Sequence, residues 1–222
     1  MDGFVSIIIL NYNGKQFNRD CINSLLQQTH THFEIIFVNN ASDDGSCEEV
    51  KTLFHDEIIA QKIHIIEPWT NIWFAWWNNA GARASSHHAE YICLLNNDTI
   101  LPSDWLRNLV VWIQSDSTLW AVGSVIYDQW YEEELHDFLF VHNKKWINNY
   151  FFDSVIVNQT DEDKQGIIIY TTWLSGCCLL YKKELLEQPF DDIYFAYMED
   201  TAMCLKIILQ WYRVGMVKNS FV

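Results

Sequence analysis

The sequence has few basic residues. In 222 residues, 14 Lys and Arg stand against 29 Asp and Glu, which gives a formal net charge of -15. Nucleic-acid phosphates and anionic lipids repel such a chain. We therefore expect no nucleic-acid partner, and we interpret the acidic residues as a solvated surface.

A long apolar segment is also missing. No run of about 20 apolar residues is present, so the sequence predicts no transmembrane segment. The apolar run at residues 5–10 is too short for the core of a signal peptide, and no basic leader precedes it. The six cysteines form no CxxC pair, which favours reduced, mostly buried thiols. Together these features predict a cytoplasmic protein.

Half of the residues are hydrophobic, which is enough for the core of one domain. Short apolar runs rich in β-branched residues alternate with amphipathic segments, as is typical of βαβ units. Predicted strands cover residues 5–10, 33–38, 63–66, 91–95, 121–126, 170–181 and 212–217, and predicted helices cover 15–28, 47–55, 74–86, 103–115 and 199–210. The fold class is therefore α/β, with a Rossmann-like, mostly parallel central sheet flanked by helices. The first helix is expected to bury a stripe formed by Phe17, Cys21 and Leu25.

Polar residues directly follow three predicted strands, at Asn11, at Asn39-Asn40 and at Asn96-Asn97-Asp98. In an open α/β sheet, ligands bind beyond the carboxyl ends of the strands. Asp98 has two interpretations. It is either a turn residue or a ligand for Mg²⁺ or Mn²⁺, hard ions that prefer carboxylate and phosphate oxygens.

The pair Glu199-Asp200 stands at the start of the predicted helix 199–210. Acidic residues are common in the first turn of a helix, where they stabilise the helix dipole. A carboxylate at this place could instead take the proton from an attacking hydroxyl. The local sequence leaves both interpretations open.

Five segments, in this order, resemble family 2 glycosyltransferases, particularly the rhamnosyltransferase-like branch. They are VSIIILNYNG, VNNASDDGS, YICLLNNDTILPSDWL, WLSGCCLLYKKE and MEDTAMCLK, and they cover almost the whole chain. The resemblance implies a GT-A fold, a nucleoside-diphosphate sugar donor, a divalent cation and inversion at the anomeric carbon. It also implies one domain over residues 1–222, with a nucleotide-sugar-binding half (1–100) and an acceptor-binding half (101–222). Family members commonly continue past the point that matches Val222, so we expect a truncated C-terminus.

The resemblance also assigns roles to individual residues. Asp98 matches the DxD-type residue that holds the metal and the diphosphate, and Asp200 matches the catalytic base. Asn39 stands where the family usually has an Asp that reads the nucleobase, and an amide offers different donors and acceptors. Asn11 and Ser42 are expected to line the nucleotide pocket with Asn39.

Asn97 and Glu199, the neighbours of Asp98 and Asp200, complete the expected substrate contacts. Two positions depart from the family pattern: Ala202 stands where a second Asp is common, and Lys206 where Arg is common. Acceptor specificity is expected in residues 127–170.

The expected function is hexosyl or rhamnosyl transfer onto a glycan or lipid-linked acceptor, in polysaccharide or cell-surface glycan synthesis. A lipid-linked acceptor would bring peripheral membrane contact. Two alternatives remain. One is a nucleotidyltransferase, for which NYNGK only weakly matches the expected Gly-rich, triphosphate-binding loop. The other is a non-catalytic relative that only binds nucleotide sugar.

Tryptophan is unusually frequent, with 11 Trp against 8 Gly. Five tryptophans stand where the family stretches have glycine: Trp73, Trp76, Trp77, Trp120 and Trp211. Tryptophan cannot replace a glycine where the backbone must turn or approach another group closely. These residues are therefore either true substitutions in a damaged relative or glycines whose codon was translated as tryptophan. Trp105 and Trp173 match tryptophans of the family.

Overall fold

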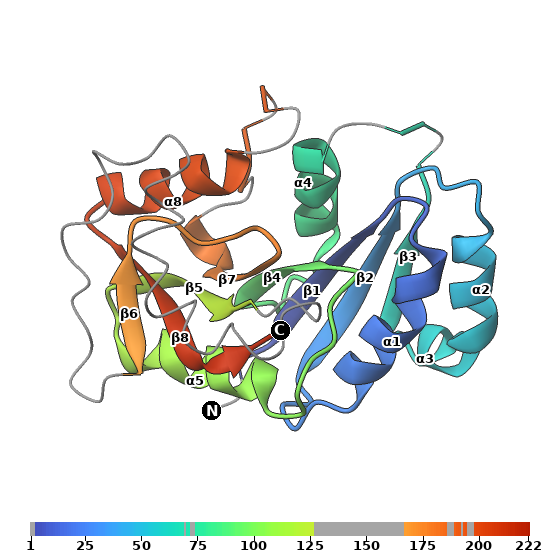
Figure 1. Ribbon diagram of the computed structural model, residues 1–222, viewed down its shortest axis with the longest axis horizontal. Coiled ribbons are helices and arrows are strands. Elements are labelled where there is room, and N and C mark those ends of the chain that lie inside the picture. The colour runs from blue at the N-terminus through green and yellow to red at the C-terminus, as the bar shows by residue number, and fades with distance from the viewer. Residues whose placement is uncertain are drawn as a thin grey trace, which may run out of the picture.

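A computed structural model describes residues 3–68, 70–71, 74–126, 167–185, 189–191, 193–194 and 198–222 (Figure 1). Most of the segment expected to determine acceptor specificity, and Trp73, lie outside the described residues. None of the described helices combines the length and the apolar character needed to cross a membrane.

In the described part of the chain, eight strands form one sheet in the order β3-β2-β1-β4-β7-β5-β8-β6. The strands are β1 (Val5–Asn11), β2 (Phe33–Asn39), β3 (Ile63–Ile66), β4 (Tyr91–Asn96), β5 (Leu119–Val125), β6 (Ile168–Thr171), β7 (Cys178–Lys182) and β8 (Arg213–Phe221). The neighbours β3, β2, β1 and β4 are parallel, whereas β7 runs antiparallel to β4 and β5. β8 runs parallel to β5, and β6 pairs antiparallel with β8.

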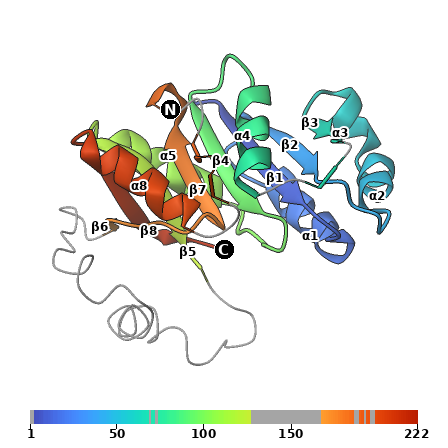
Figure 2. The same cartoon turned by 90° about the horizontal axis from the view of Figure 1, so that it is seen from above.

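Helices cover both faces of this sheet, as predicted. They are α1 (Lys15–Leu26), α2 (Ser46–Leu53), α3 (His55–Ile59), α4 (Phe74–Ala84), α5 (Trp105–Ser115) and α8 (Glu199–Leu209), with a 3₁₀ turn η2 (Lys183–Leu185). α1 and α5 lie on one face, and α4 and α8 lie on the other (Figure 1). α4 packs over β1 and β2, whereas α8 packs over β8 and β5 (Figure 2).

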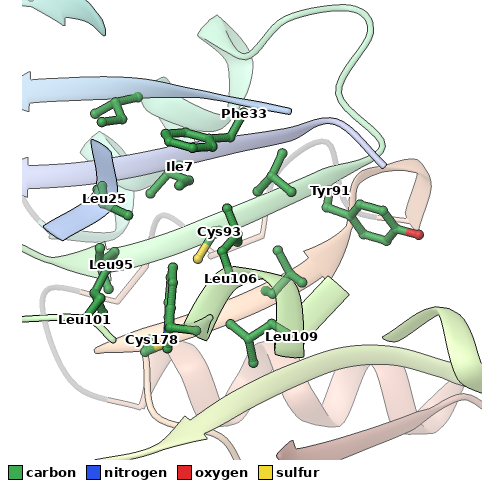
Figure 3. Close-up of a cluster of buried hydrophobic side chains, with 14 of the residues drawn as sticks. Ile7, Leu25, Phe33, Tyr91, Cys93, Leu95, Leu101, Leu106, Leu109 and Cys178 are labelled. Carbon is green, nitrogen blue, oxygen red and sulfur yellow. The ribbon is translucent and has the colours of Figure 1, made fainter. Parts of the chain in front are cut away.

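The alternation of side chains along the strands divides the core into two clusters. On β1, Ile7 points into the cluster under α1 and α5, and Ile8 points into the cluster under α4 and α8. In the first cluster, side chains from β1, β2, β4, α1 and α5 interdigitate (Figure 3). Trp105 is fully buried there, and its indole Nε1 donates to Ser124 Oγ at 2.8 Å. The continuous apolar strand runs thus reflect burial on both faces.

Three sequence predictions need correction. Residues 170–181 are not one strand: β6 pairs at the edge of the sheet and β7 lies between β4 and β5, so residues 172–177 must cross between them. The helix predicted over 47–55 breaks at Phe54 into α2 and α3. Phe17 is 43% exposed, because the buried stripe of α1 starts one residue later, at Asn18.

Gly81 lies where α4 approaches β1 most closely. A Cβ atom built at this position would come within 2.5 Å of Ile8 Cγ2, a methyl group on a fully buried strand residue. Such a methyl cannot move aside without a shift of the strand.

We expect Gly81→Ala to destabilise the fold although alanine is the better helix former. Overpacking costs about 1–3 kcal/mol, against a helix-propensity gain of about 1 kcal/mol. Thermal unfolding should therefore show a Tm lower by a few degrees, since 1 kcal/mol corresponds to roughly 2–4 °C in a domain of this size. Ala84→Gly, at an exposed position of the same helix, reports the propensity change without the clash. A Gly81→Ala protein more stable than the wild type would contradict this close approach.

Candidate active site

The carboxyl ends of β1, β2 and β4 lie side by side, and we call this edge of the sheet the rim. Asn11 is in register with Asn39, and Leu10 with Asn96. β1 is also the strand at which the strand order reverses, because the chain leaves it toward β2 and later returns to its other side at β4. The three predicted polar clusters therefore meet at the switch point of the sheet, the usual place for a ligand in this fold class.

The side chain of Asn11 is fully buried at the centre of the rim. Its Oδ1 accepts hydrogen bonds from the backbone N–H of Gly14 at 3.2 Å, from Asn18 Nδ2 at 2.9 Å and from Asn97 Nδ2 at 3.0 Å. A Cβ atom at Gly14 would collide with Asn97 Nδ2, so only glycine allows this approach. Asn11 thus joins β1, α1 and the end of β4.

The other end of the same amide points to β2 and the loop after it. Asn11 Nδ2 lies 3.0 Å from Asn39 Oδ1, 3.0 Å from Ser42 Oγ and 2.9 Å from Ser46 Oγ. An amide has two hydrogens, so it shares them among three acceptors. We call Asn11, Asn18, Asn39 and Asn97, with these two serines, the asparagine network.

Asp98 lies at the exposed end of the rim. Its carboxylate makes no hydrogen bond or ion pair with any residue in the described ranges. It lies close to Cys177, whose pKa is raised to about 12 by burial, with a further contribution from the charge of Asp98. The carboxylate is therefore free to bind a ligand.

Asp200 lies in the first turn of α8, two residues after the N-cap residue Met198. Its Oδ1 accepts from the backbone N–H of Thr201 at 2.6 Å, and its Oδ2 accepts from the backbone N–H of Gly176 at 3.0 Å. The second bond ties α8 to the link between β6 and β7. Asp200 is therefore not a simple N-cap, and its carboxylate has a fixed orientation.

The segment Ser175–Cys178 contacts both predicted catalytic regions. The backbone N–H of Gly176 donates to the Asp200 carboxylate. The carbonyl of the following residue, Cys177, accepts from the backbone N–H of Asn96 at 2.9 Å. Because β7 is antiparallel to β4, its amino end reaches the same edge as the carboxyl end of β4. The structure thus brings the Asp98 region and Asp200 to one short segment.

Sequence reasoning missed Asn18, Ser46 and Gly176. Asn18 had a usable signal, since it is a polar residue in the stripe that also holds Cys21 and Leu25. The contact of Gly176 with Asp200 spans 24 residues and had no local signal.

Glu199 is only 6% exposed. Burial raises the pKa of its carboxyl, and the negative charge of Asp200 contributes in the same direction. Its Oε2 has no hydrogen-bond partner within the part of the chain that the structure describes. A buried carboxylate oxygen without a partner is costly for folding, and such groups cluster at functional sites.

A comparison with known proteins identifies the family of this chain. The family model described as Glycosyl transferase family 2 matches residues 6–189. The chain belongs to this family. The match includes the network residues and Asp98, and it ends before Glu199.

Two relatives illustrate the range of similarity. An uncharacterized glycosyltransferase of Haemophilus influenzae is 30% identical over 125 residues, which cover 55% of this chain and 36% of the relative. The uncharacterized glycosyltransferase EpsJ of Bacillus subtilis is 28% identical over 220 residues, which cover 97% of this chain and 59% of EpsJ. This chain therefore spans less than two thirds of either relative.

A mannosyltransferase from Pyrobaculum calidifontis, solved in complex with GDP-Man and Mn²⁺, has the same fold. It superimposes with a TM-score of 0.73 at 20% identity, over 100% of this chain and 56% of the mannosyltransferase. The fold is GT-A, as the sequence motifs predict.

We expect Glu199→Gln to stabilise the fold at neutral pH. The folded state holds the Glu199 proton more tightly than the unfolded state, so folding loses stability as the pH rises above the unfolded pKa of about 4.3. Glutamine carries no charge and avoids this loss. Thermal unfolding should show a higher Tm for the variant at pH 7.5, by about 2–4 °C for each kcal/mol, and no difference near pH 4. A Tm difference that is the same at both pH values would contradict a charge effect.

Proposed function

We propose that this chain transfers a sugar from a nucleoside-diphosphate sugar to an acceptor hydroxyl, with inversion at the anomeric carbon. One observation carries the proposal: in a family 2 chain, the segment Ser175–Cys178 contacts both the strand end that precedes Asp98 and the carboxylate of Asp200. The residues proposed for the donor side and for the acceptor side would thus be positioned by the same short stretch of backbone.

The donor half of the rim suits a divalent cation. Mg²⁺ and Mn²⁺ are usually held through one or two carboxylates together with substrate phosphates. Asp98 supplies an exposed carboxylate without a competing partner in the described chain. Asn97 donates its Nδ2 hydrogens to Asn11 and Asn18, so its Oδ1 is left as a second oxygen ligand for the ion. When bound, the ion would neutralise the charge of the departing diphosphate.

Asp200 is the proposed base. In a single displacement, Asp200 takes the proton of the acceptor hydroxyl while the hydroxyl oxygen forms a bond to the anomeric carbon. The bond between that carbon and the diphosphate oxygen breaks, and the diphosphate keeps the electron pair. The two backbone N–H groups on Asp200 hold the carboxylate in place for this transfer. Glu199, beside it, would bind a hydroxyl of the substrate.

The finer assignments are also proposals. Asn39 and Ser42 would contact the nucleoside, and Asn11, which is fully buried, would act by holding both of them. The transferred sugar would be a hexose or rhamnose, and the acceptor a glycan or a lipid-linked glycan made on the cytoplasmic side.

We expect Asp98→Ala to remove the Mn²⁺-dependent part of nucleoside-diphosphate binding, because the ion would lose its protein carboxylate. The loss should exceed the roughly 10–100-fold that removal of an outer-shell partner costs. Calorimetry with and without Mn²⁺ measures it. Asp43→Ala removes an exposed carboxylate from the neighbouring loop and should bind like the wild type. Unchanged affinity of Asp98→Ala in Mn²⁺ would refute the assignment.

We expect Asp200→Asn to keep donor affinity and to lower the transfer rate by about 10²–10⁴, the usual contribution of a positioned general base. Asparagine offers one acceptor oxygen for the two N–H groups on Asp200, so a small loss of Tm is also expected. Donor affinity, transfer rate and circular dichroism should be measured on one preparation. A folded variant that transfers sugar at the wild-type rate would leave Asp200 with a structural role alone.

A further inference from the structure

The direction of the hydrogen bonds in the asparagine network is fixed by a backbone group. The N–H of Gly14 can only donate, so the atom of Asn11 that faces it must be Oδ1. The Nδ2 of Asn11 then faces β2, and Asn39 must meet it with Oδ1. The Nδ2 of Asn39 is left without a partner in the described chain.

The remaining members agree with this direction. Asn97 donates to the oxygens of Asn11 and Asn18, at 3.0 and 2.9 Å, and Asn18 donates to Asn11 at 2.9 Å. Turning the Asn11 amide over would place its NH₂ group against three donors at once. The orientation of a side-chain amide is usually ambiguous, but here the Gly14 amide decides it.

We propose that Asn39 reads the nucleobase at its N3 position, by donating its Nδ2–H to a ring nitrogen that carries a lone pair. This inference rests on the proposed function, because it assigns the polarity of the nucleoside contact. An aspartate at the same place would do the reverse and accept a base N–H. The pyrimidines separate the two cases, since N3 of cytosine carries a lone pair whereas N3 of uracil carries a hydrogen.

The matched test is Asn39→Asp, which is nearly isosteric. One carboxylate oxygen can still accept from Asn11 Nδ2, while the outward atom changes from donor to acceptor. With Mn²⁺ present, the ratio of the CDP affinity to the UDP affinity should fall by about tenfold or more, as expected for one buried hydrogen bond exchanged for a mismatch. Asn13→Asp adds the same charge in the adjacent loop and keeps the acceptor for the Asp43 N–H, so its ratio should not change.

Asn11→Asp tests whether Asn11 sets the orientation of the Asn39 amide, and it changes no residue proposed to contact the base. A carboxylate at position 11 accepts from Gly14, Asn18 and Asn97 but cannot donate to Asn39, which must turn its Nδ2 inward. The ratio should then move in the same direction as in Asn39→Asp. If CDP and UDP bind but both variants keep the wild-type ratio, the polarity inference is wrong. If no nucleoside diphosphate, GDP included, binds the wild-type chain with Mn²⁺, the proposed function itself fails.

A second, independent observation concerns the tryptophans. Trp211 lies just past the end of α8 at φ +66°, in the left-handed region. The N–H of Trp211 binds the carbonyl of Ile208 and the N–H of Tyr212 binds that of Ile207, a pair of bonds that ends helices at a left-handed residue. Glycine is strongly enriched there. The Trp211 side chain is 93% exposed, so no packing offsets the strain.

Trp77 and Trp120 are 5% and 9% exposed, and the indole N–H of each has no partner in the described ranges. Trp120 stacks on Tyr212, with ring centroids 4.0 Å apart, but it lies at a register shift between β5 and β8, where a strand often carries glycine. Trp105, in contrast, is fully buried, and its indole N–H donates to Ser124 Oγ.

We infer that positions 77, 120 and 211 are glycine in the working protein, and that their shared codon was translated as tryptophan. The inference does not depend on the proposed function. The decisive measurement is the sign of a stability change. Replacing a native buried tryptophan by glycine lowers the folding equilibrium constant by at least about 100-fold, and Trp105→Gly should do so.

Trp77→Gly should leave the folding constant unchanged or raise it, and Trp211→Gly should raise it by about 5–30-fold, as expected for relief of a left-handed residue. If the chain with tryptophan does not fold, the triple glycine variant should fold in its place. A Trp77→Gly loss as large as that of Trp105→Gly, or a triple variant that stays unfolded, would overturn the inference. So would a coding sequence with the same tryptophan codon at 77, 120, 211 and 105.

Discussion

The hydrogen bond from the Gly14 backbone to the Asn11 side chain is the constraint on which the rim depends. A buried amide must satisfy both of its ends, and each unmet partner costs about 1–3 kcal/mol. Asn11 meets this requirement with groups from the turn after β1, from α1, from the residue after β4, and from the end of β2 with the segment that follows it. The rim is therefore fixed by polar contacts within the protein before any ligand arrives, which is a form of preorganisation.

The same interaction explains what a sequence can and cannot predict here. The sequence predicts β1, β2 and β4 because each is an apolar run that ends in polar residues. Parallel pairing of these strands then places Asn11, Asn39 and Asn97 at one edge of the sheet. The buried face of α1 was misjudged by one residue, because a polar side chain was not expected in the apolar stripe. Asn18 belongs there only because Asn11 and Asn97 need a partner.

Longer-range features were beyond the reach of local patterns. The separation of β6 from β7 depends on which strands each one pairs with, and that is set by the whole sheet. The hydrogen bond between Gly176 and Asp200 joins two segments whose local sequences give no indication that they are in contact. Which end of the Asn39 amide faces outward depends on the hydrogen bond from the Gly14 backbone to Asn11. The amino-acid sequence contains no local pattern that indicates the direction of this bond.

The reversed strand β7 has a consequence for how the site tolerates change. Parallel strands present only their carboxyl ends at the rim, whereas β7 contributes its amino end, and with it the backbone N–H of Gly176. Length changes within the β6–β7 link would therefore shift the anchor of Asp200 and the contact with Asn96 together. The separation between the residues proposed for the donor side and the acceptor side would thus depend on the length of this one link.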